Sequence, residues 1–242
     1  MNHRGVYILC HQGLGDHILC NGIYREYAQR YTECVIPVLE KNYGTVNRML
    51  LDVKNIQIVI FNDEFSAFKM EAHSNMLKIF GYHTLNLGNF GSEYLVDNSK
   101  RFDVNFYHQA KLPFNLRWDS FQVKRNLTSE ENLFNLLVGA NKDYIFLHDD
   151  KVREFIIDRN LLPKNLFIVE PDEKLKDIFS FFDYLKIIEN AREIHCIESS
   201  FAALIESLEY NIPKYAHRYA RPEAKNDPRY EFTYRSKWYV YK

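Results

Sequence analysis

The chain has 242 residues, 46% of them hydrophobic, and its 31 Lys and Arg against 32 Asp and Glu give a formal charge of -1. This balance excludes the basic excess by which proteins bind nucleic acid, and no apolar run is long enough to span a bilayer. Because no cleavable apolar region precedes the first strand, we expect a soluble, cytoplasmic protein.

The first half of the chain alternates strand-like and helix-like segments. Strands are predicted at 6–10, 34–39, 56–61 and 83–87, and helices at 16–31, 43–52 and 69–80. This alternation predicts a parallel sheet covered by helices. Residues 89–125 lose the pattern and are predicted to be an irregular interdomain region that shapes a binding cleft.

A second alternating series then begins. Helices are predicted at 129–139, 173–190 and 200–209, and strands at 144–147, 166–169, 194–197 and 214–217. The aromatic tail after Arg221 is predicted to be an extended closing segment. We therefore predict an α/β protein of two Rossmann-like, doubly wound domains, residues 1–125 and 126–242, facing each other across a cleft.

The four cysteines, Cys10, Cys20, Cys34 and Cys196, lack the paired short spacings of zinc sites. They lie in apolar segments, where a reduced thiol behaves as a small hydrophobic group. We expect all four to be buried, and we expect neither a metal nor a cofactor.

The first strand ends at a loop with two glycines, Gly13 and Gly15, and an aspartate, Asp16. The free N–H groups at the start of the next helix attract anions or a reacting oxygen, and Asp16 can act as the general base that takes a proton from a hydroxyl nucleophile. The alternative is that Asp16 only caps the helix. His11 and His17 flank this loop and complete the predicted acceptor side.

A dinucleotide-binding fingerprint, as in a dehydrogenase that binds NAD, is a less favoured alternative for this loop. That motif needs a third glycine three positions after the second, where this chain has Ile18.

The strand at 194–197 also ends at a polar turn, Glu198-Ser199-Ser200, before an apolar helix. The hydroxyls and free N–H groups there can hold a diphosphate without a metal, and Glu198 can accept hydrogen bonds from ribose or sugar hydroxyls. The alternative is that Ser199 and Ser200 are ordinary helix caps.

Polar residues follow two other strands of the second half. His148 and Asp149 come directly after an apolar strand, at the carboxyl end where ligands of open α/β sheets bind. Asp149 and its neighbour Asp150 point in different directions and make a poor chelate, so hydrogen bonding to a ligand is favoured over metal binding. Arg153 is a candidate phosphate contact, and Glu170 ends the next strand in the same way.

Two motifs carry a resemblance to a known family. The opening Gly13-Leu14-Gly15-Asp16, followed by Arg25 on the helix, resembles the bacterial heptosyltransferases, whose Gly-x-Gly-Asp loop lies on the acceptor side of a GT-B glycosyltransferase with the aspartate as base. The turn that ends in Ser199-Ser200-Phe201 resembles the donor side of GT-B enzymes, including fucosyltransferases. The chain departs from this pattern after Tyr144, where no clear basic residue lies on a phosphate loop.

The resulting hypothesis is transfer of a sugar from a nucleotide-sugar donor to a glycan or other hydroxyl acceptor, inverting and independent of metal, in glycan or surface polysaccharide synthesis. Asp16 takes the acceptor proton, and the donor is bound by the second domain, Phe201 included. Peripheral membrane contact is compatible with the sequence. The alternatives are a nucleotide-sugar epimerase or hydrolase of the same fold, or a module that binds a nucleotide or sugar without chemistry.

Overall fold

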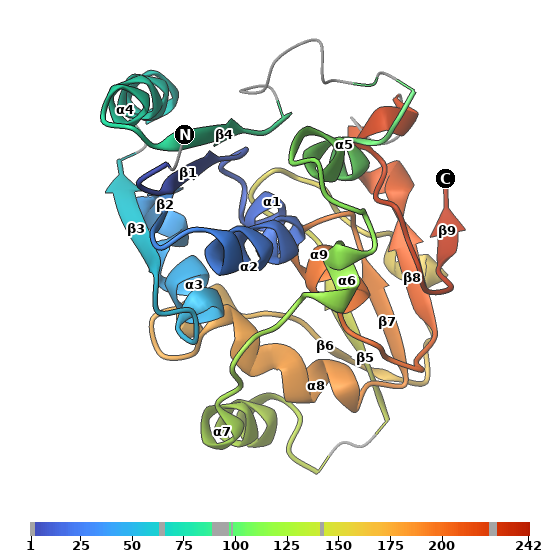
Figure 1. The fold of residues 1–242 in the computed structure, drawn as a ribbon. Coiled ribbons are helices and arrows are strands. Elements are labelled where there is room, and N and C mark those ends of the chain that lie inside the picture. Colours follow the sequence, from blue (N-terminus) through green and yellow to red (C-terminus); the bar gives the residue numbers. More distant parts are fainter. Residues whose placement is uncertain (1–2, 63–65, 89–96, 98, 141–142, 223–226) are drawn as a thin grey trace. The chain divides into compact units, whose positions relative to one another are not determined.

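The computed structural model describes the chain except residues 1–2, 63–65, 89–96, 98, 141–142 and 223–226. The chain divides into two compact units, Met1–Lys124 (unit 1) and Arg125–Lys242 (unit 2). Each unit contains one parallel sheet with helices between its strands (Figure 1). The predicted α/β class with two parallel, helix-linked sheets is confirmed.

Unit 1 has a four-stranded sheet in the order β3-β2-β1-β4. Its strands are β1 (Val6–Leu9), β2 (Cys34–Leu39), β3 (Ile56–Phe61) and β4 (His83–Asn86), close to the predicted ranges. The central strands β1 and β2 are buried along their whole length, which explains why their sequences are apolar without alternation.

Four helices connect these strands: α1 (Leu14–Leu19), α2 (Asn21–Arg30), α3 (Glu40–Leu50) and α4 (Ser66–Ile79). The prediction of one helix over 16–31 is wrong, because α1 ends and α2 begins at Cys20, whose φ of -85° and ψ of 1° are not helical. Helix α3 packs on β2 and β3, whereas α4 packs on β1, β3 and β4.

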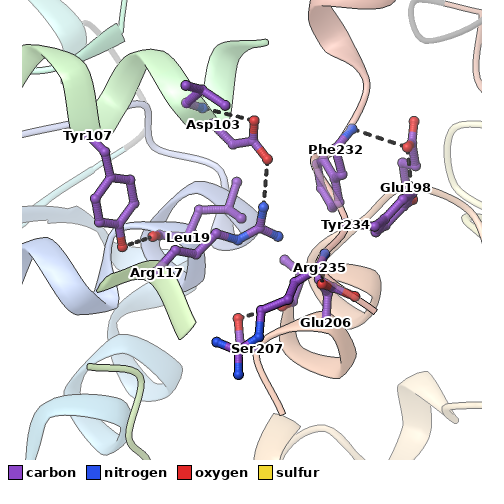
Figure 2. Close-up of polar contacts among 12 residues, drawn as sticks. Leu19, Asp103, Tyr107, Arg117, Glu198, Glu206, Ser207, Phe232, Tyr234 and Arg235 are labelled. Carbon is purple, nitrogen blue, oxygen red and sulfur yellow. Dashed lines mark hydrogen bonds and ion pairs between the residues drawn. The ribbon is translucent and has the colours of Figure 1, made fainter. Parts of the chain in front are cut away.

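The prediction that 89–125 is irregular is also wrong for the part that the structure describes. Helices α5 (Phe102–Gln109) and α6 (Leu116–Asp119) lie there. Arg117 is fully buried and donates to Asp103 at 2.6 Å, and the Tyr107 hydroxyl donates to the Leu19 carbonyl at 3.0 Å (Figure 2). These helices depend on partners distant in sequence, so a search for local periodicity misses them.

Unit 2 has a five-stranded parallel sheet in the order β6-β5-β7-β8-β9. Its strands are β5 (Tyr144–His148), β6 (Phe167–Val169), β7 (Glu193–Cys196), β8 (Lys214–His217) and β9 (Tyr239–Tyr241). The first four match the predicted strands, and the fifth belongs to the tail.

The helices of unit 2 include α7 (Leu127–Leu137), α8 (Leu185–Glu189) and α9 (Ser200–Glu206). The prediction of one helix over 173–190 is wrong: two 3-10 helices, η4 (Glu173–Leu175) and η5 (Phe181–Tyr184), precede α8. The Asp183 carboxylate accepts from the Ser180 N–H at 2.8 Å, which marks a new helix start inside the predicted one.

Two buried glutamates, Glu198 and Glu206, accept hydrogen bonds from the tail of unit 2. Glu206 accepts from the Trp238 indole N–H at 2.7 Å and from the Ser236 hydroxyl at 2.6 Å. The tail can therefore run beside β8 and end as the edge strand β9. All four cysteines are buried and none forms a disulfide, as predicted.

Candidate functional site

In unit 1 the candidate site lies where the strand order reverses. The chain passes from β1 to β2 on one side and returns to β4 on the other side of β1. In open parallel sheets, ligands bind at the carboxyl ends of the strands beside such a switch point. The predicted loop, residues 11–16, follows β1 at this edge, and Gly88 follows β4.

The two loops at this switch point touch each other. A Cβ atom built on Gly88 would lie 2.2 Å from His11 Nε2, and the φ of Gly88 is +63°, a left-handed conformation that favours glycine. The His11 ring also meets the Phe106 ring edge-on at 5.3 Å. Gln109 holds Gly88 on both sides: its Oε1 accepts from the Gly88 N–H at 2.6 Å, and its Nε2 donates to the Gly88 carbonyl at 3.1 Å.

The loop backbone is fixed by side-chain amides. Asn42 Nδ2 donates to the Gln12 carbonyl at 2.8 Å, and Gln12 Nε2 donates to the Cys10 carbonyl at 2.9 Å. These bonds tie the loop to α3 and to the end of β1. A ligand at this edge would meet an ordered loop, which lowers the entropic cost of binding.

Asp16 lies in the first turn of α1 and is partly exposed. Its carboxylate folds back toward Gly13, because a Cβ atom built on Gly13 would lie 2.6 Å from Asp16 Oδ2. Gly13, which is exposed, is the residue that precedes the helix, and Gly15 lies in the first turn. The absence of a side chain at Gly13 therefore leaves room for the Asp16 carboxylate.

His17 does not belong to the exposed loop, so its prediction as an acceptor-side residue is corrected. The side chain is fully buried, and its Nδ1 shares a hydrogen bond of 2.8 Å with the Tyr24 hydroxyl. The Tyr24 hydroxyl also lies 3.0 Å from Cys10 Sγ. One residue after Asp16, the helical rotation turns His17 toward the core.

In unit 2 the corresponding switch point lies between β5 and β7, since β6 is on the other side of β5. His148 ends β5, and its carbonyl accepts from the Ile197 N–H at 3.0 Å. Its Nδ1 shares a hydrogen bond of 2.9 Å with the Ser199 hydroxyl. Two residues that the sequence analysis selected separately, His148 and Ser199, are thus in direct contact.

His148 is neutral at neutral pH. Burial lowers the pKa of its imidazole to about 4, against smaller opposing effects of Asp149 and Asp150. A neutral imidazole has one N–H and one acceptor nitrogen. The ring can therefore either donate to the Ser199 hydroxyl or accept from it.

Phe201 is buried rather than exposed to a ligand, which corrects its prediction as a donor-binding residue. Its ring lies 4.7 Å from the His148 ring and 4.3 Å from the Phe181 ring. It supports His148 from within the core. Ser200, the first residue of α9, is partly exposed and stays at the edge.

Glu198 is also corrected. Its carboxylate is fully buried and accepts from Arg218 at 2.9 Å. It also accepts from the Tyr234 hydroxyl at 2.8 Å and from the Phe232 N–H at 3.1 Å (Figure 2). A buried carboxylate with three donors stabilises the tail and is not presented to ribose or sugar hydroxyls.

The remaining predicted donor residues are engaged within unit 2. Arg159 pairs with Asp149 at 2.9 Å and with Glu170 at 2.6 Å, so both carboxylates hold the segment that follows β5. Arg153 pairs with Asp150 at 2.7 Å on an exposed turn. Asp149 directly follows β5 and Glu170 directly follows β6, and the charges of both, like that of Arg153, are paired with opposite charges.

The structure adds a basic residue that the sequence analysis missed. Arg221 donates from its Nη1 to the Glu198 carbonyl and so lies beside the Glu198–Ser200 turn. It follows β8, whose carboxyl end is at the same edge as that of β7. Arg221 is distant from the turn in sequence, and only the order of strands in the sheet brings the two together. A correct prediction of that order could therefore have identified Arg221.

No group of three or more His, Cys, Asp or Glu among the described residues is arranged to hold a metal ion. None of the helices that these residues form is long and apolar enough to cross a membrane.

No protein-family model and no curated protein matches the chain. Solved structures do match it. Glycosyl transferase family 9 from Veillonella parvula aligns with 100% of this chain and 88% of its own, with a TM-score of 0.60 and 9% identity. E. coli ADP-heptose LPS heptosyltransferase II aligns with 88% of this chain and 84% of its own, with a TM-score of 0.54 and 12% identity.

The iron-containing dodecameric glycosyltransferase TibC from enterotoxigenic E. coli aligns with 97% of this chain and 62% of its own, with a TM-score of 0.51 and 11% identity. At these identities the similarity establishes only a shared fold, a GT-B-like chain that contains two α/β units. The heptosyltransferase-type fold agrees with the resemblance of the first loop. The resemblance of the Ser-Ser-Phe turn to fucosyltransferases stays a prediction.

Proposed function

We propose that the protein is a glycosyltransferase that moves a sugar from a nucleotide-sugar donor to a hydroxyl acceptor. The observation that carries the proposal is that the polar loops of both units lie at the switch points of their sheets, in a fold shared with glycosyltransferases. A fold alone does not establish a function, so the proposal depends on these loops.

Unit 1 would bind the acceptor through His11, Gly13, Gly15 and Asp16. In a single displacement, the acceptor oxygen forms a bond to the anomeric carbon while the bond from that carbon to the diphosphate breaks. The acceptor proton passes to the Asp16 carboxylate. The anomeric configuration inverts, because attack and departure take place on opposite faces of the sugar.

Unit 2 would bind the donor through Ser199, Ser200, His148 and Arg221. With its proton on Nδ1, neutral His148 donates to Ser199 and leaves the Ser199 O–H directed at a phosphate oxygen. Arg221 adds the positive charge that offsets the departing diphosphate. We therefore propose a reaction that needs no metal and expect activity to survive chelation by EDTA.

The test is a transferase assay with nucleotide sugars, starting with ADP-heptose, the substrate in the name of the E. coli heptosyltransferase. Asp16→Asn keeps the size of the side chain and removes its basicity, so it is expected to lower kcat by about 10²-fold to 10⁴-fold. The matched control is Asp177→Asn, which changes an exposed aspartate of unit 2 outside the candidate loops.

Full activity of Asp16→Asn with a proven acceptor would contradict the assignment of the base. Rapid turnover of the donor without acceptor would instead indicate an epimerase or hydrolase. Donor binding without turnover across an acceptor panel would indicate a binding module.

A further inference from the structure

Unit 1 has a hollow at the edge of its sheet opposite the candidate site. Three parts of the chain line it: helix α2, the turn 52–55 that precedes β3, and residues 119–122 at the end of α6 and beyond it. The turn is at the amino end of β3, whereas the loop 11–16 follows the carboxyl end of β1, and both strands run parallel to β2. The volume of the hollow is about 650 Å³, within the range of roughly 300–1,000 Å³ that small-molecule sites have.

Arg25 fixes the three parts of the chain around this hollow. Its guanidinium is buried and donates to both oxygens of the Asp52 carboxylate, at 2.7 and 2.9 Å. It also donates to the Gln122 carbonyl at 2.8 Å and to the side-chain oxygen of Asn21 at 3.0 Å. Because these bonds join α2 to the turn and to the segment after α6, a ligand would meet a preformed site, which lowers the entropic cost of binding.

Several hydrogen-bonding groups of the lining are left for a ligand. An ionised carboxylate has about four lone-pair sites, and Arg25 occupies two of them on Asp52, whose side chain is 31% exposed. The hydrogen bond from Arg25 holds the pKa of this carboxyl below its ordinary value, so it stays ionised at neutral pH. Within the described part of the chain, the Gln29 carboxamide and Gln122 Nε2 form no hydrogen bond, and Lys54 forms no ion pair. The lining thus offers a fixed acceptor together with free donors.

The charges of the lining are balanced, which favours an uncharged ligand. The positive residues are Arg25 and Lys54, and the negative ones are Asp52 and Asp119. A nucleoside diphosphate needs an excess of positive charge, and Arg25 is already paired with Asp52. Phe121 adds a partly buried aromatic ring. A saccharide matches such a lining, because its hydroxyls both donate and accept hydrogen bonds and its C–H groups pack on an aromatic ring.

We propose that this hollow is a second sugar site, which binds a neutral oligosaccharide away from the loop that carries Asp16. Its role in transfer rests on the proposed function: a glycan held there keeps its acceptor end near the loop at a raised effective concentration. The binding itself needs neither a donor nor a reaction. It can therefore be measured separately from transfer.

The test is an NMR titration of the isotope-labelled full chain with three neutral trisaccharides that differ in sugar or linkage: maltotriose, cellotriose and mannotriose. We expect at least one of them to shift the backbone amide signals of residues 25–29, 52–55 and 119–122, with a Kd of about 1 mM. ADP should leave these signals unchanged, because the lining has no excess of positive charge.

Gln29→Ala removes a free carboxamide from the lining. It is expected to raise the Kd of the trisaccharide about threefold to tenfold, because one or two hydrogen bonds are lost. Gln29 is exposed, so the melting temperature should stay close to that of the wild type. The matched control is Asn75→Ala, which removes an exposed carboxamide on α4, outside the lining, and should leave the Kd unchanged.

Three results would overturn the proposal: no shift of these signals with any of the three sugars, a Kd that Gln29→Ala does not raise, or an equal rise in Asn75→Ala. Shifts produced by ADP instead of the sugars would also overturn it, since they would assign the hollow to an anion. The two proposals fail separately. Sugar-induced shifts without transfer contradict only the proposed function, and transfer without these shifts contradicts only the second site.

Discussion

At the scale of single residues, the candidate site of unit 1 depends on the absence of a side chain at Gly88. Both the left-handed φ of +63° and the close approach of His11 disfavour a side chain at this position. The sequence marks Gly13 and Gly15 as loop glycines, but nothing local distinguishes Gly88. Its importance follows from the strand that brings it beside the β1 loop.

Gly88→Ala is expected to lower the free energy of unfolding by about 1–2 kcal/mol for the left-handed backbone, and further because the added Cβ displaces the His11 ring. Urea denaturation measures the loss. Gly81→Ala separates the two effects, because Gly81 has a φ of +85° but nothing within 4 Å of the added Cβ.

Gly44→Ala is the matched control, in which the free energy of unfolding is expected to rise instead of fall. Gly44 lies inside α3 and a Cβ there would meet nothing within 4 Å, so alanine should stabilise the helix by about 0.5–1 kcal/mol. If Gly88→Ala costs no more than Gly81→Ala, then the His11 contact has no energetic role.

At the scale of elements, strands β7 and β8 carry a buried pair of histidines. His195 Nδ1 lies 2.9 Å from His217 Nε2, His195 Nε2 lies 3.0 Å from Glu193 Oε2, and His217 Nδ1 lies 3.2 Å from the Tyr219 hydroxyl. Two neutral rings satisfy the whole chain of hydrogen bonds: Tyr219 donates to His217, His217 to His195, and His195 to Glu193. An added proton would leave one of these donors without its acceptor.

The stability of unit 2 is therefore expected to fall as the pH is lowered. Burial lowers the pKa of His217 to about 3, and burial also lowers the pKa of His195. Above the unfolded pKa of about 6.5, neither state binds the extra proton, and stability is complete. As the pH falls from there toward 3, these histidines bind protons in the unfolded chain but stay neutral in the folded chain, so the free energy of unfolding decreases.

For His217 the expected decrease in the free energy of unfolding is about 2 kcal/mol between pH 7 and pH 5. Urea titrations across this range measure the total effect. His217→Gln should flatten the pH dependence, whereas His108→Gln, at an exposed position, should not. A free energy of unfolding that is constant from pH 7 to pH 5 would contradict the neutral pair.

At the scale of the whole molecule, the two units have the same design and different polar groups. Each sheet is parallel, each has a switch point, and a loop selected from the sequence lies at both. Unit 1 has the partly exposed Asp16 carboxylate there. Unit 2 has the hydroxyls of Ser199, which is buried, and of Ser200, which is partly exposed, with Arg221 beside them. Under the proposed function, this division predicts that the nucleotide diphosphate binds to unit 2 alone.

Hydrogen exchange with and without ADP tests this division in the intact chain. Protection is expected at 148–150, 197–201 and 218–221, with no change in the loop at 11–16. Arg221→Ala should weaken ADP about tenfold, or 1.4 kcal/mol, because it removes a charge-assisted contact. Arg153→Ala is the control, since that guanidinium is engaged by Asp150 on an exposed turn. Equal losses in the two variants, or protection confined to unit 1, would contradict the assignment.

The sequence by itself determined the strands of both sheets and the loops that follow them. Periodicity and the positions of Gly13, Asp16 and Ser199 are local properties, and they are enough to locate polar turns after apolar strands. Burial of the cysteines followed from the same local reasoning. The order of strands within a sheet is not a local property, and no spacing in the chain encodes it.

Only the tertiary structure decided which polar residues face the sheet edge. Glu198, His17 and Phe201 belong to polar turns or directly follow them in the sequence, yet each is buried, because other parts of the chain supply hydrogen-bond partners or packing. The sequence did not identify Gly88 or Arg221 as site residues, because only the order of the strands brings them to the loops. Burial and proximity are properties of packed elements, and packing selects among side chains that local pattern treats alike.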